Sequence, residues 1–169
     1  TLTASLSRKL EHENAQGFDH EEDRVSLVRV HFQQKRYDEV IQLSNELIDA
    51  LGDRQLRREC LEMRAFAGKR RQAWEIMEAA WRSLLQEFPR HMEARTELAK
   101  HCEHRRRDLA EARQLCAEGI ALLETRRATL PHLVHATHMS ALQKRLARID
   151  GKLSRGGQFH REEHEVRAD

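Results

Sequence analysis

Apolar residues recur every three or four positions along most of the chain, which is the spacing of helices that bury one face. The most regular run is formed by Trp74, Met77, Trp81 and Leu84, and Pro89 marks its end because the residue before a proline avoids helical geometry. Only two prolines and seven glycines occur, so few helices are interrupted. The pattern therefore predicts an all-α chain of seven helices.

Cap and turn residues set the expected ends of these helices. Three aspartates, at positions 19, 53 and 108, are placed to accept hydrogen bonds from the free amides of a helix start, and Glu22 and Glu111 complete a capping box with the first and third. Gly52 is suited to a helix end. The expected helices run over about 19–34, 37–51, from Asp53 to a break at Gly68-Lys69-Arg70, 74–88, 91–105, from Asp108 onwards, and from Thr129-Leu130-Pro131 to Gly156-Gly157.

Three stretches of the chain repeat one helix-turn-helix pattern, and they cover residues 27–40, 61–74 and 98–112. Val40 and Trp74 are 34 positions apart, and Trp74 and Ala112 are 38 apart. The third stretch is one residue longer than the others, which indicates a short insertion. A fixed period of this size is the sequence signature of a repeat architecture.

These stretches resemble tetratricopeptide repeats in their leucines, their turn and the pair of residues that opens the second helix. Val40 and Trp74 depart from the family by standing where alanine is usual. The resemblance implies a solenoid of three antiparallel helix pairs over residues 19–155, with the seventh helix (stripe Leu142, Leu146, Ile149 and Leu153) as a C-terminal cap. Residues 1–18 are then a partly ordered N-terminal segment, and residues 156–169 form a flexible charged tail.

In this family the first helices of the pairs line a concave groove that holds a partner protein or peptide. The resemblance therefore implies a non-catalytic scaffold or adaptor, in which cations of the groove meet carboxylates of an extended or helical partner segment. The groove positions carried over to this chain are Arg29, Gln33, Glu59, Met63, Lys100 and His104.

A narrower resemblance covers residues 97–108 together with residues 145–149. These segments look like the C-terminal repeat region of bacterial ribonuclease H-like exonuclease proteins, where the repeats follow a nuclease domain built on acidic metal ligands. Nothing in this chain resembles that nuclease domain, so no catalytic residue is carried over. This resemblance implies an alternative function, an accessory nucleic-acid-associated segment of a larger nuclease or a stand-alone relative of one.

The charge of the chain leaves nucleic-acid binding open. The formal net charge is only +2, so the whole molecule has no strong field. Only six of the 30 basic residues are lysine, and arginine suits bidentate contacts with phosphate. If equivalent turns align, basic residues form a ridge that could follow a phosphate backbone, although solvated turns are the simpler interpretation. The ridge residues are Lys35, Arg36, Arg70, Arg71, Arg106 and Arg107.

Motifs for catalysis, cofactors or metals do not stand out. The chain has no GxSxG elbow and no phosphate-binding loop, so we predict no active site and no cofactor. His160 and His164 could share a metal if helical, but structural metal sites need four converging ligands, so no metal site is predicted. His132, His135 and His138 also do not converge, since they recur every three residues around a helix.

The remaining composition points to a cytoplasmic protein. Cys60, Cys102 and Cys116 are odd in number and widely spaced, which suits free thiols in a reducing compartment. No apolar run approaches the roughly 18 residues of a membrane span, and no signal peptide is visible. The expected partner is therefore a protein or peptide, with nucleic acid as the alternative and no membrane; oligomeric state is left open.

Overall fold

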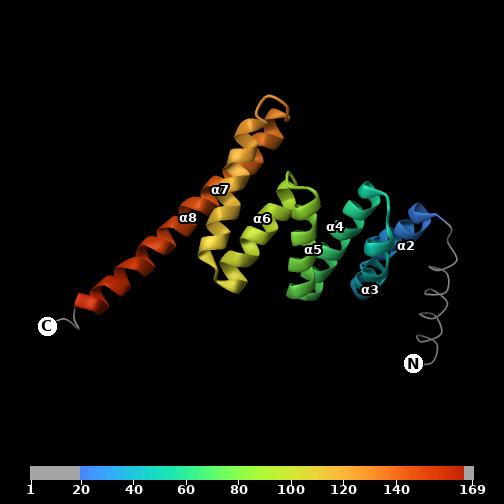
Figure 1. Cartoon of the computed structure of the whole chain (residues 1–169), viewed down its shortest axis with the longest axis horizontal. Helices are drawn as coiled ribbons and strands as arrows, with labels where there is room; N and C mark the ends of the chain where they lie inside the picture. Colours follow the sequence, from blue (N-terminus) through green and yellow to red (C-terminus); the bar gives the residue numbers. More distant parts are fainter. Residues whose placement is uncertain (1–19, 166–169) are drawn as a thin grey trace. The chain divides into compact units, whose positions relative to one another are not determined.

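A computed structural model describes the backbone of residues 20–165 and the side chains of residues 20–155. All regular structure in this range is helical, which confirms the all-α class (Figure 1). The chain forms two compact units, the first ending at Leu84 and the second beginning at Leu85. The helices are α2 (Glu21–Gln33), α3 (Tyr37–Leu47), η1 (Ile48–Ala50), α4 (Arg54–Arg71), α5 (Trp74–Glu87), α6 (Met92–His101), η2 (Cys102–Arg106), α7 (Leu109–Thr125) and α8 (His132–Glu165).

Two of the three predicted aspartate caps are present. The side chain of Asp53 accepts from the amides two and three residues ahead, at 2.7 and 2.9 Å, and Asp108 accepts from the amide of Glu111 at 2.9 Å. Helix α2 has His20 as its N-cap, without a side-chain cap bond. Asp19 lies outside the described residues. These two caps could be predicted from the sequence because each involves only residues within one helical turn.

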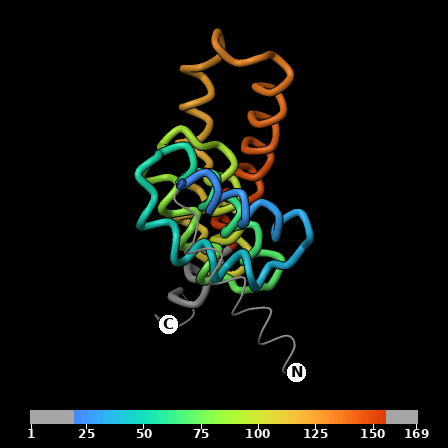
Figure 2. Tube along the Cα trace, turned by 90° about the vertical axis from the view of Figure 1, so that its right-hand side faces the viewer, coloured from blue at the N-terminus to red at the C-terminus, as the bar shows by residue number. Residues whose placement is uncertain are grey.

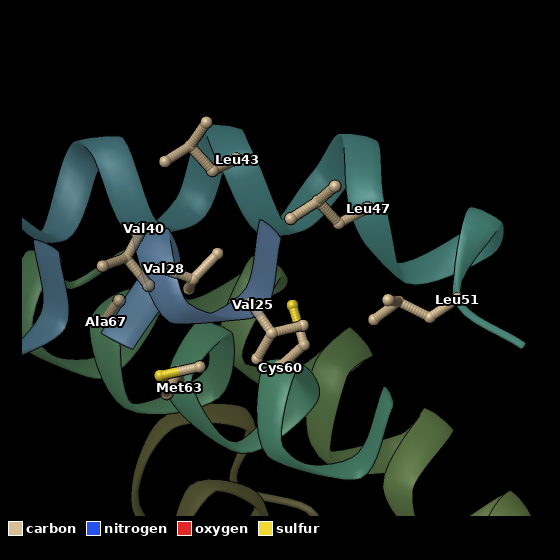
Figure 3. Close-up of a cluster of buried hydrophobic side chains, with 9 residues drawn as sticks. All are labelled: Val25, Val28, Val40, Leu43, Leu47, Leu51, Cys60, Met63 and Ala67. Atoms are coloured by element: carbon tan, nitrogen blue, oxygen red, sulfur yellow. The ribbon is translucent and has the colours of Figure 1, made fainter. Parts of the chain in front are cut away.

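The core of unit 1 lies between α2, α3 and α4 (Figure 3). Met63 is only 7% exposed and belongs to this core, so the prediction that it contacts a partner in a groove is wrong. The reason is that α4 buries this face against α2 and α3, both of which it contacts. The core consists of Val25, Val28, Val40, Leu43, Leu47, Leu51, Cys60, Met63 and Ala67.

Helix α4 also packs against α5 in unit 1. Met77 and Trp81 are buried, as the apolar stripe predicted, and Trp81 meets Phe66 edge-to-face with ring centroids 5.1 Å apart. The two helices approach closely at Gly68, because a Cβ there would be 3.0 Å from the backbone nitrogen of Met77. The predicted break at Gly68 is wrong, since α4 continues to Arg71. Glycine at this position permits close packing and does not end the helix.

The turns between paired helices share one backbone conformation. Lys35, Gln72 and Arg107 each adopt a left-handed conformation, with φ of 59°, 58° and 56°. In each turn the next residue's amide donates back to a carbonyl near the helix end, which satisfies a group the helix leaves open. These bonds run from Arg36 to His31 (2.9 Å), from Ala73 to Gly68 (2.8 Å) and from Asp108 to Cys102 (2.9 Å).

The left-handed residues correct the spacing expected for the repeats. They are separated by 37 and 35 positions, whereas the sequence alignment expects 34 and 38. The structural equivalent of Val40 is therefore Met77 and not Trp74, since Val40 and Met77 each donate their amide to the residue that follows the left-handed turn. The two alignments differ because Gly68, which the sequence pattern predicts in the turn, lies inside α4. The number of positions between the first and the third turn is the same in the structure as in the sequence alignment.

Unit 2 contains α6, η2, α7 and α8. Helices α7 and α8 form an antiparallel hairpin joined by a loop at residues 126–131, visible in Figures 1 and 2. Of the predicted α8 stripe, Leu142 and Ile149 are buried, Leu146 is half-buried and Leu153 is 39% exposed. The helical backbone continues through Gly156-Gly157 to Glu165, so the predicted helix end at the double glycine is wrong.

The extra residue of the third repeat stretch is absorbed in a π-helical turn. Residues Cys102–Arg106 form this turn, called η2, at the end of α6. Its closing bond spans six positions, from Asp108 back to Cys102, whereas the other two turns span five. A π-bulge is the usual way for a helix to accommodate one inserted residue, and such bulges often reposition side chains.

Gly68→Ala is expected to destabilise the protein by about 1–3 kcal/mol, because the added methyl group meets backbone atoms of α5 that move only with the helix. The matched control is Gly151→Ala in α8, where a Cβ meets nothing within 4 Å. There the higher helix propensity of alanine should stabilise by up to ~1 kcal/mol. Urea unfolding of both variants measures the difference, and equal stabilisation by the two would refute the close approach at Gly68.

Candidate functional site

A salt-bridged pair of helices forms the first candidate surface, in unit 1. Arg29 on α2 donates from Nε and Nη2 to the two carboxylate oxygens of Glu59 on α4, at 2.5 and 2.7 Å. Its Nη1 donates to Glu22 at 2.5 Å and to the hydroxyl of Ser26 at 3.0 Å. These bonds raise the pKa of the Arg29 guanidinium above its ordinary value. Arg29 therefore ties α2 to α4.

This geometry changes the role predicted for the groove residues of unit 1. Arg29 and Glu59 face each other, so a partner carboxylate could reach Arg29 only by displacing Glu59 or the exposed Glu22. Glu22 and Glu59 outnumber Arg29, and the surface therefore has a local charge of −1. Gln33 is exposed one turn further along α2. We name this set, Glu22, Ser26, Arg29, Gln33 and Glu59, the α2–α4 surface.

The other two predicted groove residues belong to unit 2. Lys100 donates from Nζ to Glu97 at 2.5 Å, within the same helix. His104 is exposed in the π-helical turn, with its Nε2 3.4 Å from a carboxylate oxygen of Glu103. The predicted groove residues thus fall in two separate local surroundings, one in each unit.

The basic turn residues of unit 1 gather at one end of that unit. Arg71 donates from Nε to Asp38 at 2.7 Å, which links the end of α4 to the start of α3 and brings the two turns together. Lys35, Arg36 and Arg70 are exposed there. Among the residues that the structure describes, Lys35 and Arg70 form no ion pair. This end therefore carries more positive than negative charge.

The equivalent turn of unit 2 carries Arg106 and Arg107. Arg106 lies 3.5 Å from the carboxylate of Glu111, and Arg107 is the exposed left-handed residue of the turn. Both residues are exposed. A continuous ridge of all six basic residues stays a prediction.

The strongest electrostatic feature of unit 2 is a buried carboxylate that no motif revealed. The side chain of Glu103, in the π-helical turn, has no exposed surface. Arg148 donates to it from Nε and Nη2 at 2.7 and 2.6 Å, Arg145 from Nη1 at 2.6 Å and Lys152 from Nζ at 2.7 Å. The hydrogen bond from Arg148 holds the pKa of Glu103 well below its usual range. We name these four residues the Glu103 cluster.

The Glu103 cluster joins two segments that are 42 to 49 positions apart. One segment is the π-helical turn at the end of α6, and the other is the part of α8 from Arg145 to Lys152. Sequence reasoning missed their contact because a glutamate among arginines ordinarily indicates pairs within one helix. The available signals were the extra residue in the third repeat and the spacing of Arg145, Arg148 and Lys152 along one face.

The cysteines form no reactive or metal-binding group in the described part of the chain. All three are free, as predicted, and all three are buried. Burial raises the pKa of the Cys60 thiol to about 12 and also raises that of Cys116, so both thiols stay protonated at neutral pH. No three His, Cys, Asp or Glu side chains among residues 20–155 are placed to hold a metal ion. His160 and His164 lie beyond the side chains that the structure describes.

Comparisons with known proteins give no relative to guide the assignment. No protein-family model, no curated protein and no solved structure matches this chain. Within the described residues, no helix has both the length and the apolar character needed to cross a bilayer. The function must therefore be argued from the surfaces themselves.

Glu103→Gln is expected to destabilise unit 2 by roughly 3 kcal/mol, because it removes the charge that three cations share in a buried position. Asp150→Asn is the control, since it breaks the exposed α7–α8 pair with Arg113 and should cost no more than about 1 kcal/mol. Chemical denaturation of both variants measures the costs. Equal small effects would show that the Glu103 cluster does not hold α8.

The same cluster should make stability depend on pH. The folded pKa of Glu103 is lowered, so its contribution is fully present above the unfolded value of about 4.3 and is lost as the pH falls below it toward the folded pKa. Between about pH 4.5 and 2 the wild type should therefore lose more unfolding free energy than Glu103→Gln. Parallel curves for the two proteins over this range would contradict the assignment.

Proposed function

We propose that this chain is a non-catalytic helical-repeat module that binds a protein partner, and that the α2–α4 surface faces that partner. The observation that carries the proposal is that two first helices lie side by side, fixed by the Arg29–Glu59 ion pair, with polar groups on their outer side. A surface held rigid by its own ion pair loses little side-chain entropy when a partner binds. Buried free thiols suit the cytoplasmic location that we propose with it.

The surface also suggests the chemistry of the partner segment. Its local charge of −1 and the 59% exposure of the Glu22 side chain favour a basic residue opposite Glu22. Val30, next to Arg29 on α2, is 45% exposed and is one of the few large apolar side chains open to solvent in the described part of the chain. We therefore propose a segment that presents one cation and one apolar side chain at neighbouring positions.

A photo-crosslinking amino acid at Gln33 should give discrete adducts with the partner in cell extract, because Gln33 is an exposed member of the α2–α4 surface. The same amino acid at Asn45, exposed on α3, is the matched control and should give none. Adding Val30→Asp should weaken the Gln33 adducts roughly tenfold, since burying a valine contributes about 1.5–3 kcal/mol. Equal adducts from both positions would refute this surface.

The alternative function is an accessory nucleic-acid-associated segment that uses the basic turns. What favours it is the exposure of Lys35, Arg70 and Arg107, which form no ion pair among the residues that the structure describes. Replacing all three by glutamine should reduce retention on heparin at moderate salt and leave helicity unchanged. Arg71 and Arg106 are left in place because they lie near Asp38 and Glu111. Unchanged retention would remove the turns from consideration.

A further inference from the structure

Five cations lie along one face of α8. On a helix of 3.6 residues per turn they fall within an arc of about 100° and span about 16 Å along the axis. Arg145 and Lys152 form the inner edge of this arc and reach Glu103, while the other members lie further out. We name them the α8 stripe: Lys144, Arg145, Arg148, Lys152 and Arg155.

The charge of the α8 stripe is poorly balanced. Glu103 is the single carboxylate that contacts it among the described side chains, and it sits beneath the stripe with no exposed surface. Asp150 of the same helix points to the other side, where it pairs with Arg113. Lys144 and Arg155 are exposed and form no ion pair within the described part of the chain. Three of the five cations therefore share one carboxylate, and the other two have none among the described side chains.

Glu103 also fixes how the stripe is presented. It binds Arg148 through two parallel hydrogen bonds, which orients a guanidinium whose side chain is still 46% exposed. Lys152 is held in the same way while 35% of its side chain stays open to solvent. The three cations that bind Glu103 are thus ordered before any ligand arrives, so these side chains lose less entropy on binding an anion. A stripe built only of solvated side chains would lack this order.

We propose that the α8 stripe binds the phosphate backbone of a nucleic-acid duplex, through charge and without reading sequence. A duplex carries one phosphate per 3.4 Å of axis on each strand, so a stripe of about 16 Å on one side of it can contact several phosphates of the two strands. This goes beyond the protein-binding function proposed for unit 1, because it concerns another surface, in unit 2.

Two observations favour a duplex over other polyanions. The α8 segment from Lys144 to Arg155, which carries the stripe, has no phenylalanine, tyrosine, tryptophan or histidine, and binders of single strands stack bases on aromatic side chains. Protein interfaces need buried apolar or aromatic anchors, yet the arc of the stripe contains no large apolar side chain between Lys144 and Arg155. A row of cations, three of them held in place by Glu103, suits a regular array of phosphates.

The test is fluorescence anisotropy of the full chain with labelled duplex DNA and duplex RNA of roughly 20 base pairs, each compared with its single strand, across a salt series. With three to five phosphate contacts, log K should fall against log salt with a slope of about −2.7 to −4.5. Duplexes should bind more tightly than single strands. Two sequences of equal length should bind alike, since no base is read.

Lys144→Gln with Arg155→Gln removes two contacts without touching the Glu103 cluster. The slope should become about 1.8 less steep, which corresponds to roughly 60-fold weaker binding at 0.1 M salt. Arg90→Gln with Arg127→Gln is the control of equal charge change, since both residues are exposed in turns of unit 2 outside α8. The control should bind like the wild type.

Several outcomes would overturn the proposal. They are no duplex binding at about 50 mM salt, equal weakening by the two double variants, and tighter binding of single strands than of duplexes. Tighter binding of a polyglutamate peptide than of the duplex would point to an acidic protein partner instead. Loss of binding on changing Lys35, Arg70 and Arg107 to glutamine, with the stripe variant unaffected, would place the contact on the turns.

Discussion

The carbonyl groups left open at the end of a helix need donors before the chain turns back, and much of the structure depends on how this need is met. At the end of α2, α4 and η2 one residue takes a left-handed conformation, and the following amide donates to a carbonyl of the helix just completed. The first two turns close over five positions and the third over six. The extra residue produces the π-helical turn, and that turn carries Glu103 to a position with no exposed surface. A buried carboxylate needs cations, and α8 supplies three.

Both units connect helices through a central charged group, but the sign of that group differs between them. In unit 1 one arginine lies between two carboxylates, and the α2–α4 surface keeps a small negative charge. In unit 2 one carboxylate lies under three cations, and the outer face of α8 keeps a positive charge. Both arrangements hold helices together, and both leave charge on the outside. The net charge of +2 conceals this contrast because it sums over the whole chain.

Much of the local structure could be predicted from the sequence. The Asp53 and Asp108 caps, the stop at Pro89 and the buried Met77 and Trp81 depend on residues within one or two turns. Candidate surfaces were harder to predict. Met63 has the pattern of an apolar stripe and also the groove position of a repeat, and only the packing of α4 against α2 and α3 shows which one applies.

The sequence by itself determined that this protein is all-helical, where most helices begin, and that its thiols are free, because periodicity, capping and cysteine spacing act locally. Only the tertiary structure decided the position of the second turn, since Gln72 takes a left-handed conformation that its side chain does not signal, whereas the nearby Gly68 lies inside α4. It also decided the pairing of Arg29 with Glu59 and of Glu103 with α8. These partners lie 30 to 49 positions apart, so no local pattern could join them.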